Sequence, residues 1–522
     1  MAQPNIELLS RRAVGHAEAG DWDAARADWL GALDIAPASA EVMLELSYVE
    51  SLAGRYRDAR EWALRAAQAG PRSFESMSSL VKRLRTFNEG AALHEFAAGL
   101  LEDRCTPHGL LVECAMQLSN LNDFDLALQC AESATTKAPA DPVARLVHGQ
   151  LLAHHGRTGR AIEELTGTLA RNPRIASAWW MLARLRKQTP ESNHVARLRT
   201  LLAMPGLRPA DVAPMARALH KELDDLGDHA GAWEALQLLC DTVRPTLRYD
   251  RAETRNLFDA LVAWSPAVAP AEPGSIIPGG TPVFIVGMHR SGTTLLEQML
   301  DASPQVRGLG ELYDFTAWMR FATDHACRFP IDAGLVQRAH GVDFASVGRR
   351  YIEGVAWRLD GESHFTDKQP ANFLNAGFIC RALPQAKILH MVRDPMETCF
   401  SNLRELFTGV NEYSYDQLEL ADYFLQYRRL MAHWHALYPG RILDVDYARL
   451  TADPGQVMRE VAAFCGVDYT EGMRSTASSK RAVGTASAVQ VREEVALRAV
   501  PKWQPYARHL QPMREALERG GL

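Results

Sequence analysis

VFIVGMHRSGTTLLEQML, at residues 283–300, decides the fold of the second half of the chain. The apolar run from Val283 to Val286 predicts a buried strand, the glycine-bounded residues after it predict a tight loop, and the next apolar residues predict a helix. A loop of this kind directs backbone N–H groups and a helix N-terminus at an anion. We therefore expect a phosphate-binding loop whose contact residues are Arg290, Ser291, Gly292, Thr293 and Thr294.

A second apolar run, Lys387 to Val392, predicts another strand with Arg393 at its end. Asp394 and Pro395 then fit the N-cap and first position of a helix that carries Ser401. An arginine at a strand end and a hydroxyl on the next helix are suited to a second phosphate, which we expect to lie far from the first loop. Taken alone, the two residues equally fit a salt-bridged surface arginine and a solvated serine.

Strand–loop–helix units with anion loops at the strand ends favour a three-layer α/β domain with a mostly parallel sheet. We expect this P-loop-like domain over residues 283–522. SPAVAPAEPGSIIPGGTP, at residues 265–282, precedes it and predicts a linker, because proline and glycine interrupt regular structure.

The first half of the chain repeats every 34 residues. Small or turn-forming residues mark the equivalent positions, which are Gly20, Gly54, Asn88, Asn122 and Gly156. Columns of alanine, aromatic residues and proline keep the same phase, and only the third repeat is degenerate. Two antiparallel helices per unit explain this pattern, because small residues allow close packing and proline ends the second helix. Residues 5–187 resemble the tetratricopeptide repeat (TPR) family, an α-solenoid.

Residues 188–264 remain helical in pattern, and LGDHAGAWEAL around Gly227 predicts one more divergent repeat. The whole chain has 522 residues, 47% of them hydrophobic and 23% charged, which indicates several globular domains. A net charge of −6 gives no general attraction to nucleic acid. The sequence shows no secretory signal or membrane span, so we expect a cytoplasmic protein without a membrane partner. Eight scattered cysteines without a CxxC pair disfavour disulfides and zinc.

Residues 282–510 resemble the sulfotransferase family. GMHRSGTT fits its 5′-phosphosulfate motif, and the spacing of Arg393 and Ser401 fits its 3′-phosphate motif. The resemblance implies 3′-phosphoadenosine 5′-phosphosulfate (PAPS) as the sulfuryl donor and 3′,5′-ADP (PAP) as the product. It also implies that the reaction needs no metal ion.

Within that family the chain is most similar to the protein-tyrosine sulfotransferase branch. Glu311 in RGLGEL matches its general base, and Lys368 in TDKQPAN matches a lysine near the scissile S–O bond. Further matches to donor-contacting positions are Tyr447, Ser487 and Lys502. The resemblance implies in-line sulfuryl transfer to a hydroxyl, with Arg290 and Lys368 stabilising the departing phosphate. If Glu311 is not the base, His340 and His364 are the next candidates.

Other interpretations remain open at this stage. Glu311 also fits a local ion pair, and Lys368 a surface lysine. A P-loop kinase or NTPase would use Asp444 or Asp446 for magnesium, although Thr293 stands where such enzymes carry a lysine. A TPR adaptor with an inactive C-terminal domain is a further alternative.

The acceptor is open too, because a long repeat array and the lack of a membrane anchor distinguish the chain from the tyrosine branch. One interpretation is that the array recognises a peptide acceptor. The other is that it only stabilises the enzyme or dimerises it, and in the latter case the protein forms a homodimer.

Overall fold

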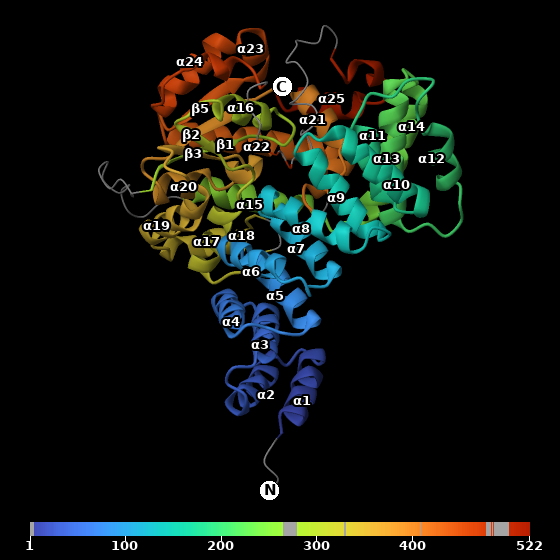
Figure 1. Cartoon of the computed structure of the whole chain (residues 1–522). Helices are drawn as coiled ribbons and strands as arrows, with labels where there is room; N and C mark the ends of the chain where they lie inside the picture. Colours follow the sequence, from blue (N-terminus) through green and yellow to red (C-terminus); the bar gives the residue numbers. More distant parts are fainter. Residues whose placement is uncertain are drawn as a thin grey trace. The chain divides into compact units, whose positions relative to one another are not determined.

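The computed structural model describes residues 5–264, 279–327, 330–407, 409–476, 482, 484 and 501–522 (Figure 1). It divides into two compact units. The first contains Met1–Pro139 and Tyr313–Trp357, and the second contains Ala140–Leu312 and Arg358–Leu522. Each unit therefore combines part of the helical array with part of the C-terminal half. The domain boundaries drawn from the sequence stay a prediction, since compactness groups the residues differently.

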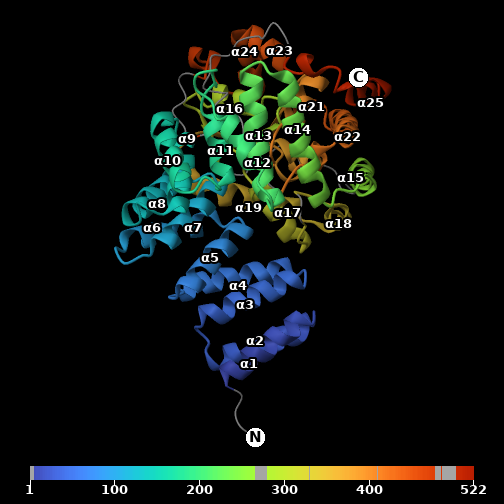
Figure 2. The same ribbon diagram turned by 90° about the vertical axis from the view of Figure 1, so that its right-hand side faces the viewer.

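The first unit contains four antiparallel helix pairs. Their helices are α1 (Ile6–Glu18), α2 (Trp22–Ile35), α3 (Ala40–Leu52), α4 (Tyr56–Ala69), α5 (Phe74–Thr86), α6 (Gly90–Glu102), α7 (His108–Asn120) and α8 (Phe124–Lys137). Figure 2 shows the first two pairs stacked on each other. Three later helices complete the unit, namely α17 (Asp314–Thr323), α18 (Ala333–Arg338) and α19 (Phe344–Val355).

The second unit continues the array with α9 (Pro142–His154), α10 (Thr158–Arg171), α11 (Ala176–Arg184), α12 (Val195–Leu202), α13 (Pro209–Asp225), α14 (His229–Val243) and α15 (Arg251–Ala263). The helices α13 and α14 lie side by side in Figure 2 and form the divergent pair predicted around Gly227.

The marker residues of the repeat lie in the turn inside each helix pair. All have left-handed backbone, with φ of 77° at Gly20 and Gly54, 60° at Asn88, 61° at Asn122 and 72° at Gly156. Gly227 has the same conformation, with φ of 78°. Glycine and asparagine tolerate this region best, because other side chains clash there with the backbone. The 34-residue repeat therefore places one residue with left-handed backbone in the turn of each helix pair.

A five-stranded, fully parallel sheet forms the centre of the α/β part. Its strands are β1 (Thr281–Val286), β2 (Val306–Gly308), β3 (His364–Asp367), β4 (Lys387–Val392) and β5 (Ile442–Asp446). In space their order is β2-β3-β1-β4-β5. The two strands expected from the sequence, 283–286 and 387–392, are both confirmed.

Helices cover both faces of this sheet, which confirms the three-layer expectation. Val283, Ile285, Leu389 and Met391 point to one face, where they pack with α16 (Thr293–Leu300) and α24 (Pro454–Cys465). Side chains alternate along a strand, so His390 points to the other face and bonds Tyr427 of α22 (Gln417–Leu437). The remaining helices of this part are α20 (Ala376–Ala382), α21 (Pro395–Leu403), α23 (Tyr447–Ala452) and α25 (Gln511–Arg519).

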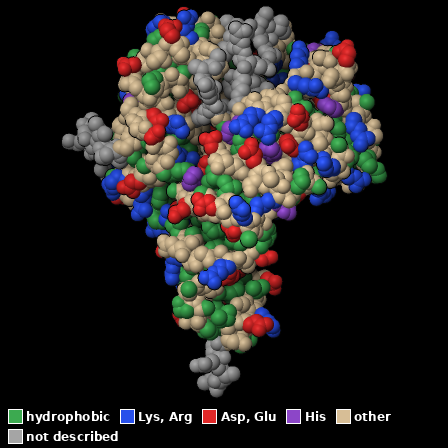
Figure 3. Space-filling model, in the orientation of Figure 1, with side chains coloured by type: hydrophobic (Ala, Val, Ile, Leu, Met, Phe, Trp, Pro, Cys, Tyr) green, Lys and Arg blue, Asp and Glu red, His purple; other side chains and the backbone are tan. Residues whose placement is uncertain are grey.

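Acidic and basic side chains are interspersed on the face drawn in Figure 3. This face therefore carries small patches of both charges and is not uniformly positive or negative. Within the described ranges, no helix combines the length and the apolar character needed to cross a membrane.

Candidate active site

The carboxyl ends of all five strands carry residues that the sequence singled out. Glu311 follows β2, Lys368 follows β3, the loop 287–292 follows β1, Arg393 follows β4 and Tyr447 follows β5. The parallel register aligns these ends, since Phe284 pairs with Asp367 on one side and Val286 with His390 on the other. Ligands of open α/β sheets bind at this edge. The topology thus gathers five distant segments into one candidate site.

Two glycines shape the loop because side chains would not fit there. A Cβ atom on Gly287 would lie 2.8 Å from the carbonyl oxygen of Met391, and one on Gly292 would lie 2.5 Å from the Tyr447 ring. Arg290 between them has left-handed backbone, with φ of 68°. The buried Ser291 hydroxyl has no hydrogen-bond partner among the described residues. A narrow turn with a spare buried donor, followed by the N-terminus of α16, fits an anion.

Arg290 links this loop to the second predicted anion segment. Its side chain is only 7% exposed, and its Nε donates to the Ser401 hydroxyl at 3.3 Å and lies 3.9 Å from Glu405 Oε2. Burial lowers the pKa of Arg290, an effect that the Glu405 carboxylate opposes. The second phosphate contact was expected far from the loop, but here Ser401 touches Arg290. The expected distance is therefore wrong for this arrangement, because β4 pairs directly with β1.

Arg393 packs against the same loop. Its Nη1 donates to the Arg290 carbonyl oxygen at 3.1 Å, its Nη2 to Glu397 Oε2 at 2.6 Å, and its guanidinium lies 4.5 Å from the centre of the Tyr447 ring. The backbone N–H of Lys502 donates to the other oxygen of Glu397 at 2.7 Å. Arg393, Tyr447 and Lys502 thus converge, whereas Ser487 lies outside the described residues.

On the other side of the loop, Lys368 Nζ donates to Glu311 Oε1 at 2.7 Å. The lysine side chain is 0% exposed, while that of Glu311 is 31% exposed. The Lys368 backbone N–H also donates to the Gly310 carbonyl oxygen at 2.9 Å, which ties the ends of β2 and β3 together. A buried ammonium therefore holds a carboxylate that solvent and an acceptor can reach.

His289 is a neighbour of this pair that the sequence analysis missed. The pKa of His289 is lowered to about 4, mainly by burial and in part by the charges of Lys368 and Arg290, while Glu311 raises it. Its ring is therefore neutral near neutral pH and able to accept a proton. The alternative base His364 begins β3, at the opposite end from Lys368, and His340 belongs to the first unit. The position of His289 inside the loop motif was the available clue.

The two aspartates of the kinase alternative already have partners. Asp444 Oδ1 accepts from His390 Nδ1 and His435 Nε2, both at 2.7 Å. These three residues form the one group of possible metal ligands found in the described part of the chain. Asp446 accepts from the Arg449 backbone N–H at 2.8 Å and caps α23. Their contacts favour structural roles over a magnesium site at the loop.

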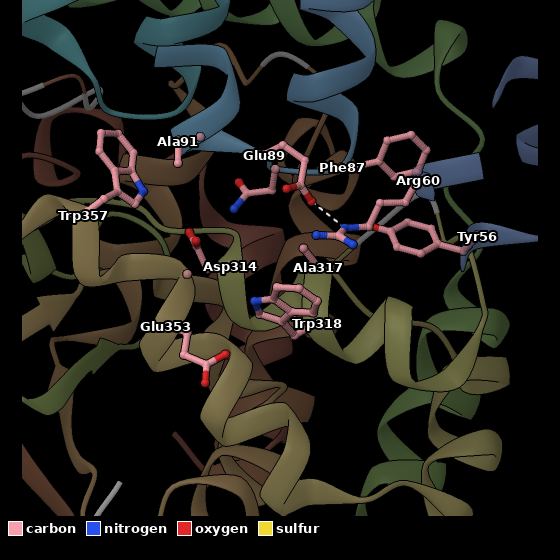
Figure 4. Close-up of a pocket in the computed structure, with 13 residues that line it drawn as sticks. Tyr56, Arg60, Phe87, Glu89, Ala91, Asp314, Ala317, Trp318, Glu353 and Trp357 are labelled. Carbon is pink, nitrogen blue, oxygen red and sulfur yellow. Dashed lines mark hydrogen bonds and ion pairs between the residues drawn. The ribbon is translucent and has the colours of Figure 1, made fainter. Parts of the chain in front are cut away.

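The first unit contains a separate cavity of about 200 Å³ (Figure 4). It lies between the second and third repeats and the helices α17 and α19. Its charged and aromatic walls include Arg60, Glu89, Asp314, Trp318, Glu353 and Trp357. Arg60 Nε pairs with Glu89 Oε1 at 2.5 Å, as the dashed line in Figure 4 marks. None of the lining residues was predicted as a site residue.

Comparison with known proteins connects both halves to described families. Residues 282–471 match the model of the sulfotransferase family, and residues 11–74, 115–166 and 146–186 match the tetratricopeptide repeat. The third repeat falls in the unmatched interval, as its degenerate sequence predicts.

Curated relatives align with part of the chain. An uncharacterised Aquifex aeolicus protein is 32% identical over 344 residues, covering 64% of this chain and 45% of that protein. Protein-tyrosine sulfotransferase 2 of Gallus gallus is 27% identical over 207 residues, covering 36% and 52%. The protein-tyrosine sulfotransferase of Drosophila melanogaster is 26% identical over 211 residues, covering 37% and 39%. This chain spans about half the length of the curated relatives it matches.

From these matches, residues 282–471 are a sulfotransferase-family domain, and tetratricopeptide repeats precede it in the same chain.

Proposed function

We propose that this protein transfers a sulfuryl group from PAPS to a hydroxyl acceptor and releases 3′,5′-ADP. The observation that carries the proposal is the convergence of Glu311, Lys368, Arg290 and Arg393 at one edge of the sheet, in the order of strands β2, β3, β1 and β4. PAPS supplies an activated S–O bond when bound. The protein must then hold two anionic groups, stabilise charge on the leaving oxygen and remove one proton.

Charge stabilisation is assigned to the loop. Sulfuryl transfer resembles phosphoryl transfer in its demands, because negative charge spreads over the transferred group and grows on the leaving oxygen. The buried guanidinium of Arg290 and the buried ammonium of Lys368 flank the loop and supply positive charge away from solvent. Backbone N–H groups of Gly292, Thr293 and Thr294 at the start of α16 add fixed dipoles.

Proton removal is assigned to Glu311. The hydrogen bond from Lys368 fixes its carboxylate, and its partial exposure leaves it accessible to a hydroxyl. His289, neutral because its pKa is held at about 4, is the second group near this pair that is able to accept a proton. Both residues therefore enter the test of the base.

The distal phosphate of the donor is assigned to Arg393 and Ser401, with Tyr447 and Lys502 beside them. Arg393 already stacks on the Tyr447 ring and bonds the same carboxylate as the Lys502 backbone. These contacts favour one preorganised anion pocket, which binds a phosphate with little loss of side-chain freedom.

The acceptor belongs to the same proposal. Two relatives are named protein-tyrosine sulfotransferases, so a tyrosine hydroxyl of a peptide or protein is the first acceptor to test. We further propose that the repeats of the first unit recognise a macromolecular acceptor through the cavity of Figure 4, whose carboxylates and Trp357 suit a basic side chain. No nucleic acid or membrane is needed as a partner.

Incubation of the full chain with PAPS and a tyrosine peptide tests the activity. We expect the peptide to gain the mass of one sulfuryl group while 3′,5′-ADP appears in equal amount. Binding of 3′,5′-ADP in preference to ATP with magnesium separates this function from a kinase. Absence of transfer to tyrosine peptides, sugars and small phenols, with no 3′,5′-ADP binding, would falsify the proposal.

A further inference from the structure

Two arginines of the helical array belong to the second unit, a half-buried one, Arg184, and a buried one, Arg217. Arg184 ends α11, and Arg217 lies on α13, which packs against α11. Their guanidinium carbons lie 5.4 Å and 4.1 Å from the centre of the Trp180 ring. Arg217 is only 6% exposed, and its buried Nε has no hydrogen-bond partner among the described residues. An arginine in such a position is costly, because burial removes the water that stabilises its charge.

The neighbouring charges increase this cost. The pKa of Arg217 is lowered to about 9, mainly by burial and in part by the charges of Arg404, Arg290 and Arg184, while the Glu405 carboxylate raises it. The same carboxylate acts on Arg290, together with Arg404 and Arg184. We call Arg184, Arg217, Arg290 and Arg404 the arginine cluster. Arg404 Nη1 also lies 3.7 Å from Asp224 Oδ2, so the carboxylates of Glu405 and Asp224 contact this cluster of four cations. An added anion would balance the positive charge that these two carboxylates leave.

A purely structural explanation accounts for less. Stacking on Trp180 would hold one arginine in place, but an apolar side chain of similar length would fill that space without burying charge. It gives no reason for four arginines from α11, α13, the loop and the end of α21 to lie within electrostatic reach of one another. Cations gathered from separate elements around one loop are typical of an oxyanion site.

The side of the loop indicates which anion this is. Two sets of residues adjoin the loop. Glu311 and Lys368 act on His289, on the side assigned to the acceptor. Ser401, Glu405 and Arg404, at the end of α21, act on Arg290, on the side assigned to the donor. The charges that act on Arg217 all belong to this second set or to Arg184.

We propose that Arg217 and Arg184 extend the anion site of Arg290 and Ser401, so that the helical array binds an oxyanion of the sulfuryl donor. This inference rests on the proposed function for the identity of the donor, but not for the presence of an anion site. According to this inference, the repeats of the second unit bind the donor directly. They differ in this role from the repeats of the first unit, which are assigned to the acceptor.

The test is Arg217→Met, which keeps length and removes charge. By calorimetry we expect the affinity for 3′,5′-ADP to fall about tenfold or more, the usual loss for a charge-assisted contact. The ligand-free Tm should stay level or rise, since a costly buried charge is gone. Arg184→Met should act in the same direction. The matched control is Arg197→Met on α12, an exposed arginine whose loss should leave affinity unchanged.

The outcomes separate the two proposals. An unchanged 3′,5′-ADP affinity in Arg217→Met overturns the inference, even if the KM for an acidic acceptor rises. A lowered Tm that Arg217→Lys restores without restoring affinity also overturns it, because a packing role would then explain the site. If the wild type binds inorganic phosphate through Arg217 but not 3′,5′-ADP, the anion site stands and the proposed donor fails.

Discussion

The two units use the same helix pairs for opposite chemistry. Gly54 in the first unit and Gly227 in the second turn their pairs with φ of 77° and 78°. Yet the first unit encloses a cavity with Glu89, Asp314 and Glu353 in its wall, whereas the second gathers the arginine cluster. The residues at the marker positions therefore determine how the helices pair. The residues between these positions determine which charges the helix faces carry.

Most of the segment between β2 and β3 belongs to a different unit from the two strands themselves. Glu311 and Lys368 stay with the sheet, while Tyr313–Trp357 between them groups with the first repeats. This segment therefore contributes residues to the acid-lined cavity, and in the sequence it closely follows Glu311, the proposed base. Variants in one unit, each matched with a variant in the other, test the proposed division between binding of the acceptor and chemistry on the donor.

The largest effect is expected from Glu311→Gln. This change keeps a hydrogen-bond acceptor for Lys368 but removes the proton acceptor, and loss of a general base typically lowers kcat by about 10² to 10⁴. Initial rates at saturating PAPS measure kcat, and calorimetry should show nearly unchanged 3′,5′-ADP affinity. Glu353→Gln, a carboxylate of the first unit, is the control and should leave the rate with a small phenol unchanged. Full turnover by Glu311→Gln would mean that another residue is the general base. His289→Gln would then be the next variant to measure.

Removal of the two arginines at the loop should have the next largest effect. Arg290→Ala and Arg393→Ala should each weaken 3′,5′-ADP binding about 10- to 150-fold, since each loses a charge-assisted hydrogen bond. Arg393→Ala should also reduce the preference for 3′,5′-ADP over 5′-AMP, which lacks the 3′-phosphate. Arg60→Ala in the first unit is the matched control for lost charge. An unchanged nucleotide preference would show that Arg393 does not contact the distal phosphate.

The contact between Arg290 and Ser401 sharpens that prediction. Because the two side chains are 3.3 Å apart, the losses in Arg290→Ala and Ser401→Ala should not add in the double variant. Fully additive losses would mean that the two groups act on separate parts of the donor, as the sequence alone suggested.

A smaller effect is expected at the cavity of the first unit. Trp357→Ala removes an aromatic wall and should raise the KM for a protein or peptide acceptor several-fold, as loss of one aromatic contact of about 0.5 to 2 kcal/mol does. The KM for a small phenol and the affinity for 3′,5′-ADP should not change. An equal loss with both acceptors would mean that the array is structural.

The smallest effect concerns the turns. Gly54→Ala and Gly227→Ala each place a side chain in left-handed backbone with no atom within 4 Å of the new Cβ, so only strain of about 1 to 2 kcal/mol is added. Urea unfolding measures this loss. If the two units unfold separately, the two variants should shift different transitions, whereas equal shifts of one transition would indicate a single cooperative structure.

Local rules made much of this protein predictable. The strand, loop and helix of residues 283–300 follow from an apolar run and two glycines, and Arg393 follows from the end of β4. The same rules missed His289, although it lies inside the loop motif, since the interaction of Lys368 and Glu311 with it depends on segments far away in the chain. They also placed the second phosphate contact far from the loop, because the pairing of β4 with β1 cannot be inferred from either strand alone.

Local sequence preferences account for the helix pairs of the array, the positions of their turns and the loop after β1. These depend on the backbone preferences of glycine, asparagine and proline, which act within a few residues. Tertiary packing selects the strand order that joins Glu311 to Lys368, the grouping of Tyr313–Trp357 with the first repeats, and the electrostatic interaction of Arg217 with Arg290. Those contacts join residues far apart in the chain, and the packing of the whole fold selects them, because no local preference distinguishes one distant partner from another.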